Sequence, residues 1–398
     1  AVKVDKVIVV VGLTDAMETE GFDRTHLNLP RNQNEIIKRM TQIHNNVCVV
    51  VLGGSVVNLD FEPYVKGILQ GYLGGQGSVR AIMNILYGKT NPSGRLAETF
   101  IDRINQCNVS LNDDNNAVYY KESIYMGYRY YNTFDKPVRY PFGDGLSYSK
   151  FLYSNFHVEE HKGDYKVTFK LKNEGPYDGK EVILLFIENN VSSVHKAKRE
   201  LKYFDKVHLQ VDEEKEMSII LPRSALEVYD VATKEFVVES GLYKIQVAKH
   251  VEEILYSKEI LVEGVELEYN QSSYKLDVYD TSDFERIYGH KLPPRNIKKK
   301  RPYAMDSTLE DLQTTFIGRR IANVVLKEGQ KEMLDINEPW MVEVAQKTLR
   351  ETPLRMLALF SDGKVSFNML EGIIDIANLK ILKGIKKLMK DKKGKNHE

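Results

Sequence analysis

The chain has 398 residues, of which 42% are hydrophobic and 28% charged, as in ordinary globular proteins of two or three domains. Its 56 basic and 56 acidic residues cancel, so its net charge gives no reason to expect nucleic acid or an anionic membrane as a partner. No apolar stretch reaches the roughly 18 residues that a membrane span requires. Two cysteines are too few for a disulfide framework, and Cys48, inside an apolar run, is expected to be a buried thiol.

The start of the chain is unusual. It begins Ala1-Val2-Lys3 without a methionine and is inside an apolar run by Val7, which suggests a piece cut from something longer. Any targeting signal at a true N-terminus would then lie outside this sequence. With no signal peptide in view, a cytoplasmic location is the expectation.

Residues 1–150 alternate strand and helix patterns. Continuous β-branched runs at 7–11 and 47–52 end at glycines, as strands buried on both faces of a parallel sheet do. Residues 68–73 indicate a third strand, and amphipathic helices are expected at 34–43 and 78–87. We therefore predict an α/β domain with a mostly parallel sheet, whose functional groups follow the carboxyl ends of the strands.

The remainder changes character twice. Residues 151–262 contain short alternating segments separated by turn signals, which predicts a β-sandwich of immunoglobulin or fibronectin type. Strands are expected at 151–158, 165–172, 181–187, 216–221 and 243–248. Residues 263–306, with Pro293-Pro294 and a basic run, suggest an extended linker. A helical tail is expected over 307–398, with helices near 307–327, 339–350 and 366–390.

The loop after the first strand contains a dense cluster of charged residues. It reads Glu18-Thr19-Glu20-Gly21-Phe22-Asp23-Arg24, with four charged residues among seven. Glu18 and Glu20 could act as proton donor and acceptor, and Asp23 beside Arg24 could orient the loop. On charge alone, a solvated surface loop is the more economical interpretation.

A family resemblance changes that weighing. The segment from Glu20 to Arg24 is similar to the Glu-Gly-x-Asp-Arg segment of family 3 glycoside hydrolases, the β-glucosidase-like enzymes. Further matches follow in the family's order over residues 4–262: Leu29-Pro30 with Gln33, Gly71-Tyr72-Leu73-Gly74-Gly75-Gln76, Asn91-Pro92-Ser93-Gly94-Arg95-Leu96, Gly127-Tyr128-Arg129-Tyr130-Tyr131, Tyr140-Pro141-Phe142-Gly143-Asp144-Gly145, Asn173-Glu174-Gly175 and Gly179-Lys180-Glu181-Val182. The last two resemble the family's fibronectin type III-like domain. Most of these residues are expected to be structural, since Asn91-Pro92-Ser93-Gly94 forms a turn by its own chemistry.

The resemblance implies a retaining exo-acting β-glycosidase that acts on β-linked glucosides or related oligosaccharides. Its general acid/base would be Glu20, which directly precedes the glycine, with Glu18 as the alternative; Phe22, Asp23 and Arg24 would complete the substrate loop. In the family the nucleophile is an aspartate on a (β/α)8 barrel, which this sequence does not encode. The resemblance also implies that residues 1–150 lack the N-terminal part of the family's sheet domain. The chain would need that barrel as a partner, in cis or in trans, and would be inactive alone.

Other function classes fit the sequence less well. A non-catalytic carbohydrate-binding or interaction module is the main alternative, because the sandwich is present and the barrel is not. A redox or nucleotide protein is disfavoured, since no Gly-x-Gly-x-x-Gly or P-loop pattern follows a strand. The scattered histidines form no metal-binding motif. We expect no cofactor and no metal, and leave homo-oligomer formation open.

Overall fold

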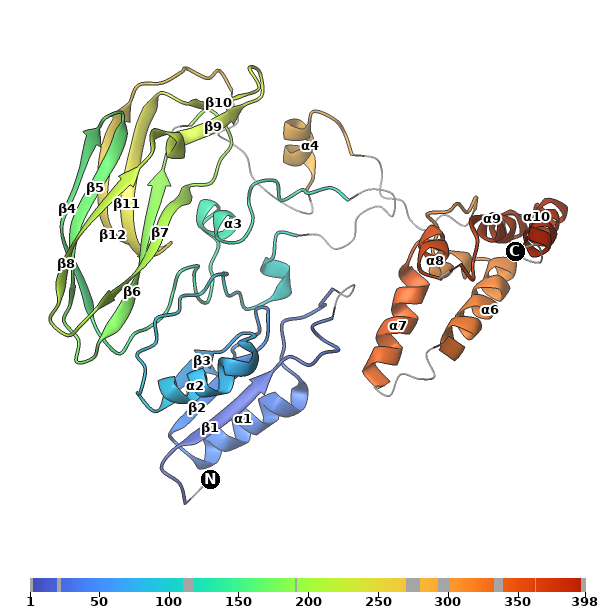
Figure 1. Cartoon of the computed structure of the whole chain (residues 1–398), viewed down its shortest axis with the longest axis horizontal. Helices are drawn as coiled ribbons and strands as arrows, with labels where there is room; N and C mark the ends of the chain where they lie inside the picture. Colours follow the sequence, from blue (N-terminus) through green and yellow to red (C-terminus); the bar gives the residue numbers. More distant parts are fainter. Residues whose placement is uncertain are drawn as a thin grey trace. The chain divides into compact units, whose positions relative to one another are not determined.

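The computed structural model describes residues 3–19, 23–109, 118–189, 192–269, 280–292, 301–332, 339–361 and 363–394 (Figure 1). The chain forms two compact units. The first consists of Ala1–Leu13, Thr25–Ser110 and Lys121–Lys291, and the second of Thr14–Arg24, Leu111–Tyr120 and Leu292–Glu398. Within the described residues, no helix is both long and apolar enough to cross a bilayer.

The first unit opens with a three-stranded parallel sheet. Its strands follow chain order and are β1 (Val7–Gly12), β2 (Val47–Leu52) and β3 (Gly67–Gln70). Helix α1 (Arg31–Ile43) joins β1 to β2 and buries Ile37 completely. Helix α2 (Ser78–Leu86) ends just before Gly88, whose φ of +67° lies in the region that favours glycine as a helix terminator. The predicted parallel α/β arrangement is confirmed.

The two long strands differ in how far they are buried. Val47, Val49, Val50 and Val51 of β2 are completely buried, because this central strand has a neighbour on each side. The prediction of burial on both faces is wrong for β1, where Ile8 and Val10 are 39% and 60% exposed. Cys48 is only partly buried, and that burial raises the pKa of its thiol.

An antiparallel sandwich follows, as predicted. One sheet has the order β12-β11-β6-β7 and the other β4-β5-β8, with a separate β9–β10 hairpin. The strands are β4 (Phe151–His161), β5 (Asp164–Asn173), β6 (Gly179–Glu188), β7 (Arg199–Leu209), β8 (Glu214–Leu221), β9 (Glu227–Asp230), β10 (Glu235–Val238), β11 (Gly241–His250) and β12 (Glu253–Val262).

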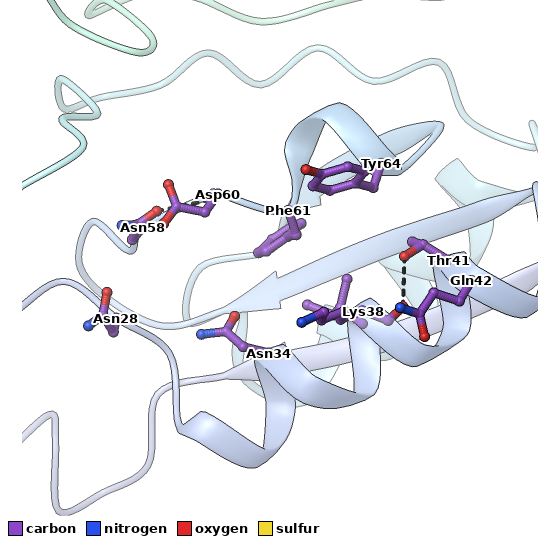
Figure 2. Close-up of a pocket in the computed structure, with 10 residues that line it drawn as sticks. Asn28, Asn34, Lys38, Thr41, Gln42, Asn58, Asp60, Phe61 and Tyr64 are labelled. Atoms are coloured by element: carbon purple, nitrogen blue, oxygen red, sulfur yellow. Dashed lines mark hydrogen bonds between the residues drawn. The ribbon is translucent and has the colours of Figure 1, made fainter.

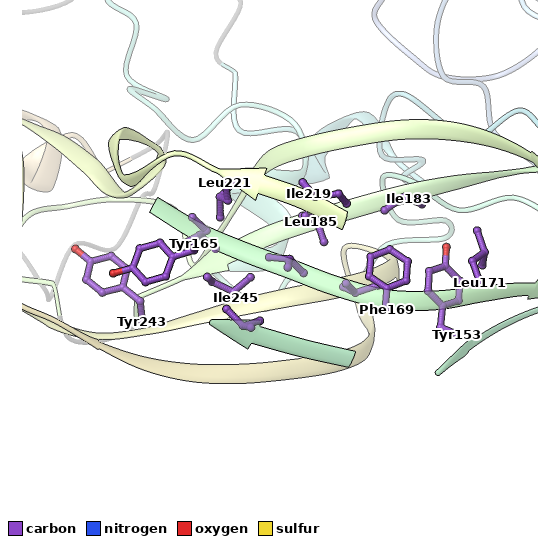
Figure 3. Packing of buried hydrophobic residues seen from close by; sticks show 14 of the residues in the cluster. Tyr153, Tyr165, Phe169, Leu171, Ile183, Leu185, Ile219, Leu221, Tyr243 and Ile245 are labelled. Carbon is purple, nitrogen blue, oxygen red and sulfur yellow. The ribbon is translucent and has the colours of Figure 1, made fainter. Parts of the chain in front are cut away.

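The sandwich core lies between these two sheets (Figure 3). Along β5, buried residues alternate with half-buried ones, so that Phe169 and Leu171 face inward with Tyr165 and Val167. Strand β6 is buried almost throughout. Its Leu185 joins the sandwich core, whereas Phe186 belongs to a second cluster with Tyr128 and Phe142. Strand β6 therefore packs on both faces.

The helical tail has a core of its own. Helices α5 (Leu309–Leu312), α6 (Phe316–Glu332), α7 (Pro339–Glu351), α8 (Leu354–Phe360), α9 (Phe367–Ala377) and α10 (Ile381–Gly394) form it. Leu309, Leu312, Ala322 and Ala377 are completely buried. In the range expected to be an extended linker, the described residues include α4 (Ser282–Tyr288), while Pro293-Pro294 lies outside them. The predicted succession of α/β sheet, β-sandwich and helices is confirmed.

Candidate active-site edge of the sheet domain

The carboxyl ends of β1, β2 and β3 form one edge of the parallel sheet. Val11 lies opposite Val51, which in turn lies opposite Gln70, so the three strands end in register. Loops that follow such strand ends hold the functional groups of open α/β sheets. The loop of Glu18 and Glu20 follows β1 at this edge.

Two backbone contacts fix where that loop leaves the strand. The N–H of Leu13 donates to the carbonyl of Leu52 at 3.0 Å, extending the pairing of β1 and β2 by one residue. The N–H of Gly12 donates to the side-chain oxygen of Gln33 in α1 at 2.8 Å. A Cβ on Gly12 would lie 2.3 Å from the carbonyl oxygen of Leu52, so only glycine fits this close approach.

The loop itself begins with a tight turn. The Thr14 carbonyl accepts hydrogen bonds from the N–H groups of Met17 at 2.8 Å and Glu18 at 3.0 Å. Glu18 and Arg24 are half-buried and Asp23 is exposed. Glu20, the predicted acid/base, and Phe22 lie outside the described residues. The assignment of Glu20 over Glu18 therefore stays a prediction.

Two polar residues at the same edge were not assigned a role from sequence. Both amide atoms of Gln70, at the end of β3, and the hydroxyl of Tyr72 are buried without a hydrogen-bond partner among the described residues. Burial, and to a lesser degree the charge of Glu98, raises the pKa of Tyr72 to about 12, so its phenol stays protonated and can donate. Tyr72 also has a φ of +47°, which is strained for a bulky side chain. The motif around Gly71 was visible in the sequence, but the burial of its polar groups is a tertiary effect.

Other motif residues connect the sheet domain to the sandwich. Asn91 donates to the Asp178 carbonyl at 3.2 Å and accepts from the Ser147 hydroxyl at 2.9 Å. Arg95 forms an ion pair of 2.7 Å with Glu181 of β6, and both side chains are more than nine-tenths buried. These contacts give the Asn91-to-Arg95 segment a structural role at this junction.

The tyrosines of the matched motifs divide into two groups. Tyr128 stacks on Phe142, with ring centroids 4.7 Å apart, and its hydroxyl accepts from the N–H of Leu201 in β7. Tyr140 instead donates to Glu62 within the sheet domain at 2.6 Å. Only part of that tyrosine set therefore contacts the sandwich.

A parallel α/β sheet followed by an antiparallel sandwich is the arrangement that the resemblance to the glycoside hydrolase class implies. Comparison with known proteins supports that class. Residues 1–148 match the glycosyl hydrolase family 3 C-terminal domain, and residues 181–251 match the fibronectin type III-like domain. The chain therefore carries the C-terminal domain of glycoside hydrolase family 3, followed by a fibronectin type III-like domain.

Individual proteins similar to this chain are beta-glucosidases. Thermostable beta-glucosidase B of Acetivibrio thermocellus is 33% identical over 380 residues, which are 94% of this chain and 46% of that protein. The crystal structure of a Bifidobacterium adolescentis GH3 beta-glucosidase aligns with 80% of this chain and 43% of its own, with a TM-score of 0.64 and 29% identity. A Kluyveromyces marxianus beta-glucosidase, solved in complex with glucose, aligns with 66% of this chain and 32% of its own, with a TM-score of 0.63 and 30% identity. The chain thus spans less than half the length of these relatives.

Proposed function

We propose that this chain supplies the general acid/base of a retaining β-glucosidase-like hydrolase, with Glu20 as that residue and β-linked glucosides as substrates. The observation that carries the proposal is the loop at the end of β1, fixed at its start by Gln33, in a chain that contains the family 3 C-terminal domain. Phe22, Asp23 and Arg24 would shape the substrate side of this loop.

The chemistry needs two carboxyl groups roughly 5–5.5 Å apart. Protonated Glu20 gives its proton to the glycosidic oxygen while a carboxylate of the partner barrel attacks the anomeric carbon, so the leaving alcohol departs and a glycosyl ester forms. Glu20, now ionised, takes a proton from water as that water's oxygen attacks the anomeric carbon. The barrel carboxylate is released and Glu20 is protonated again.

A (β/α)8 barrel, in cis or in trans, is the proposed partner. The uncovered face of β1 supports a polypeptide neighbour of some kind, since Ile8 and Val10 present apolar side chains to solvent there. The same face would tend to make the isolated chain associate with itself. A measured mass in solution, with and without the barrel, separates barrel binding from homo-oligomer formation.

The test is to join the chain to a family 3 barrel, or to co-express the two, and to measure hydrolysis of cellobiose. Activity is expected only with the barrel present. Glu20→Gln should lower the cellobiose rate by about 10²–10⁴-fold, the usual contribution of a general acid. An aryl glucoside with a good leaving group should lose much less, because its departure needs little protonation.

The matched variant is Glu18→Gln on the same loop. A larger loss of cellobiose hydrolysis in Glu18→Gln than in Glu20→Gln would assign the proton donor to Glu18. Full cellobiose activity in both variants would remove the acid/base role from this loop. Failure to gain any activity from a folded complex with the barrel would favour the non-catalytic carbohydrate-binding or interaction module.

A further inference from the structure

A cavity lies in the sheet domain, between α1 and the segment that contains the short 3-10 helix η1 (Glu62–Tyr64) (Figure 2). Its volume is about 440 Å³, within the range of small-molecule sites. Ile37 and Phe61 line it with buried apolar surface. Tyr64 also lines it and is 71% exposed, so its ring is accessible to a ligand.

One wall is a polar stripe along α1. Asn34, Lys38 and Gln42 are spaced four residues apart, which places them on one face of the helix, and all three are exposed. Figure 2 shows these side chains on the helix below the segment that carries Phe61 and Tyr64. Across the described part of the chain, the three side chains make no hydrogen bond or ion pair. Their donors and acceptors are available to a ligand.

A further amide comes from the segment before α1. Asn28 lies between Leu27 and Leu29, which are 8% and 2% exposed, while Asn28 itself is exposed. Its side chain lines the cavity and, like those of the α1 stripe, has no partner among the residues described. The cavity thus collects three free amides from two segments.

The opposite wall is held in place by a charged network. Arg139 forms ion pairs with Glu62 and Asp102, both at 2.5 Å, and the Tyr140 hydroxyl also donates to Glu62. Asn58 accepts from the N–H of Asp60 at 2.9 Å and donates to the Asp102 carbonyl at 3.3 Å. The wall that carries Phe61 and Tyr64 is therefore fixed before any ligand arrives, which lowers the cost of binding.

The chemistry of the lining selects among ligands. Amides donate and accept at neighbouring atoms, as the hydroxyls of a sugar do, and an exposed aromatic ring offers an apolar face to the C–H groups of a pyranose. The described lining holds one cation, Lys38, and one anion, Asp60, so it carries no excess charge that would favour a phosphate.

We propose that this cavity is a binding site for a neutral oligosaccharide. A sugar ring stacks on Tyr64, and its hydroxyls exchange hydrogen bonds with Asn28, Asn34 and Gln42. Such a site would bind a polysaccharide or oligosaccharide chain on the sheet domain with or without the barrel. The proposal does not depend on the proposed catalytic role of Glu20.

The experiment is calorimetric titration of the full 398-residue chain with cellotetraose, without a barrel. Saturable binding is expected, and Tyr64→Ala should weaken it by about tenfold, while Tyr64→Phe should bind like the parent chain because the ring is kept. Tyr87→Ala is the matched control: Tyr87 is also a surface tyrosine, 67% exposed, and does not line this cavity. Asn34→Ala should weaken binding as well.

The proposal is overturned if cellotetraose shows no saturable binding to the folded chain, or if Tyr64→Ala binds as tightly as Tyr87→Ala. Displacement of the sugar by inorganic phosphate would overturn the neutral-ligand assignment. Glu20→Gln should leave the affinity unchanged, and loss of binding in that variant would place the sugar on the acid/base loop instead. Failure of the proposed hydrolase would change none of these results.

Discussion

Gln33 and Gly12 are joined by a hydrogen bond of 2.8 Å from the Gly12 N–H to the Gln33 side-chain oxygen, across 21 residues of sequence. The bond connects the first turn of α1 to the last residue of β1, where the proposed catalytic loop begins. Because α1 starts at Arg31, this bond holds together the two ends of the segment that connects β1 to α1.

Gln33→Leu tests this connection. Loss of the acceptor leaves the half-buried Gly12 N–H without its partner, and the free energy of unfolding should fall by about 1–3 kcal/mol. In the barrel-complemented enzyme, kcat for cellobiose should fall as well, because the loop start is no longer fixed. Thermal unfolding and steady-state rates measure the two effects. Gln33→Glu keeps an acceptor oxygen and is the control; equal rate losses in both variants would contradict a positioning role.

The ion pair of Arg95 and Glu181 predicts an asymmetric response to mutation. Burial raises the pKa of Glu181, and the neighbouring Arg95 opposes that rise. Glu181→Gln leaves a buried guanidinium without a counter-charge, which should cost about 3–5 kcal/mol in chemical denaturation. In Arg95→Met the remaining carboxyl can be neutralised by a proton.

The sign of the pH effect in Arg95→Met follows from linkage. With Arg95 gone, the folded-state pKa of Glu181 rises further above its unfolded value, so the folded state binds more protons as pH falls. The loss of stability in Arg95→Met should therefore shrink at low pH, whereas that in Glu181→Gln should not. Melting temperatures of both variants relative to the parent chain at about pH 8 and about pH 5 measure it. Parallel behaviour of the two variants would be evidence against a raised pKa at Glu181.

His195 predicts acid sensitivity. Burial, and then the charge of Arg286, lowers the pKa of its imidazole from 6.5 to about 4, and the ring packs edge-on to Tyr125 and lies 3.2 Å from the Ser123 hydroxyl. The folded state keeps this ring neutral while the unfolded chain protonates it, so stability falls as pH drops from 6.5 towards 4. His195→Gln does not titrate, and the melting temperature of the parent chain relative to this variant should decline across that window. A constant difference would count against the shifted pKa.

Gly143 predicts a backbone requirement at the junction of sheet domain and sandwich. Its φ is +90°, and an added Cβ would lie 2.8 Å from the Leu184 side chain and 3.2 Å from the His250 Cα. Gly143→Ala should lower the free energy of unfolding by about 1–3 kcal/mol. Gly94→Ala, where an added Cβ meets nothing within 4 Å, should leave it nearly unchanged. Equal melting temperatures for the two variants would show that the loop relaxes.

The sequence predicted elements best where local pattern and burial coincide. The run at 47–52 became β2 without any shift of its ends, because a central strand is apolar on both faces. Strands β7, β9, β10 and β12 were not predicted. In β7 and β12, charged residues interrupt the alternation of apolar and polar positions. The sequence also did not predict that one face of β1 is exposed. A β-branched run indicates that a strand can be buried, but it does not show whether another element packs against that strand.

The candidate site was predictable to a smaller extent. The family motifs included Gln33 and Tyr72. They did not predict the hydrogen bond between Gln33 and Gly12 or the burial of the Tyr72 hydroxyl, because both depend on residues distant in sequence. The stripe of Asn34, Lys38 and Gln42 was readable as one helix face, yet nothing local places Phe61 and Tyr64 across from it.

The self-contained core of the helical tail has an evolutionary consequence. Leu309, Leu312, Ala322 and Ala377 belong to a hydrophobic cluster whose described members all lie between residues 303 and 377. Such a cassette can be gained, exchanged or lost by recombination of gene segments without exposing the sandwich core. Selection can therefore act on the core of the tail separately from the core of the sandwich.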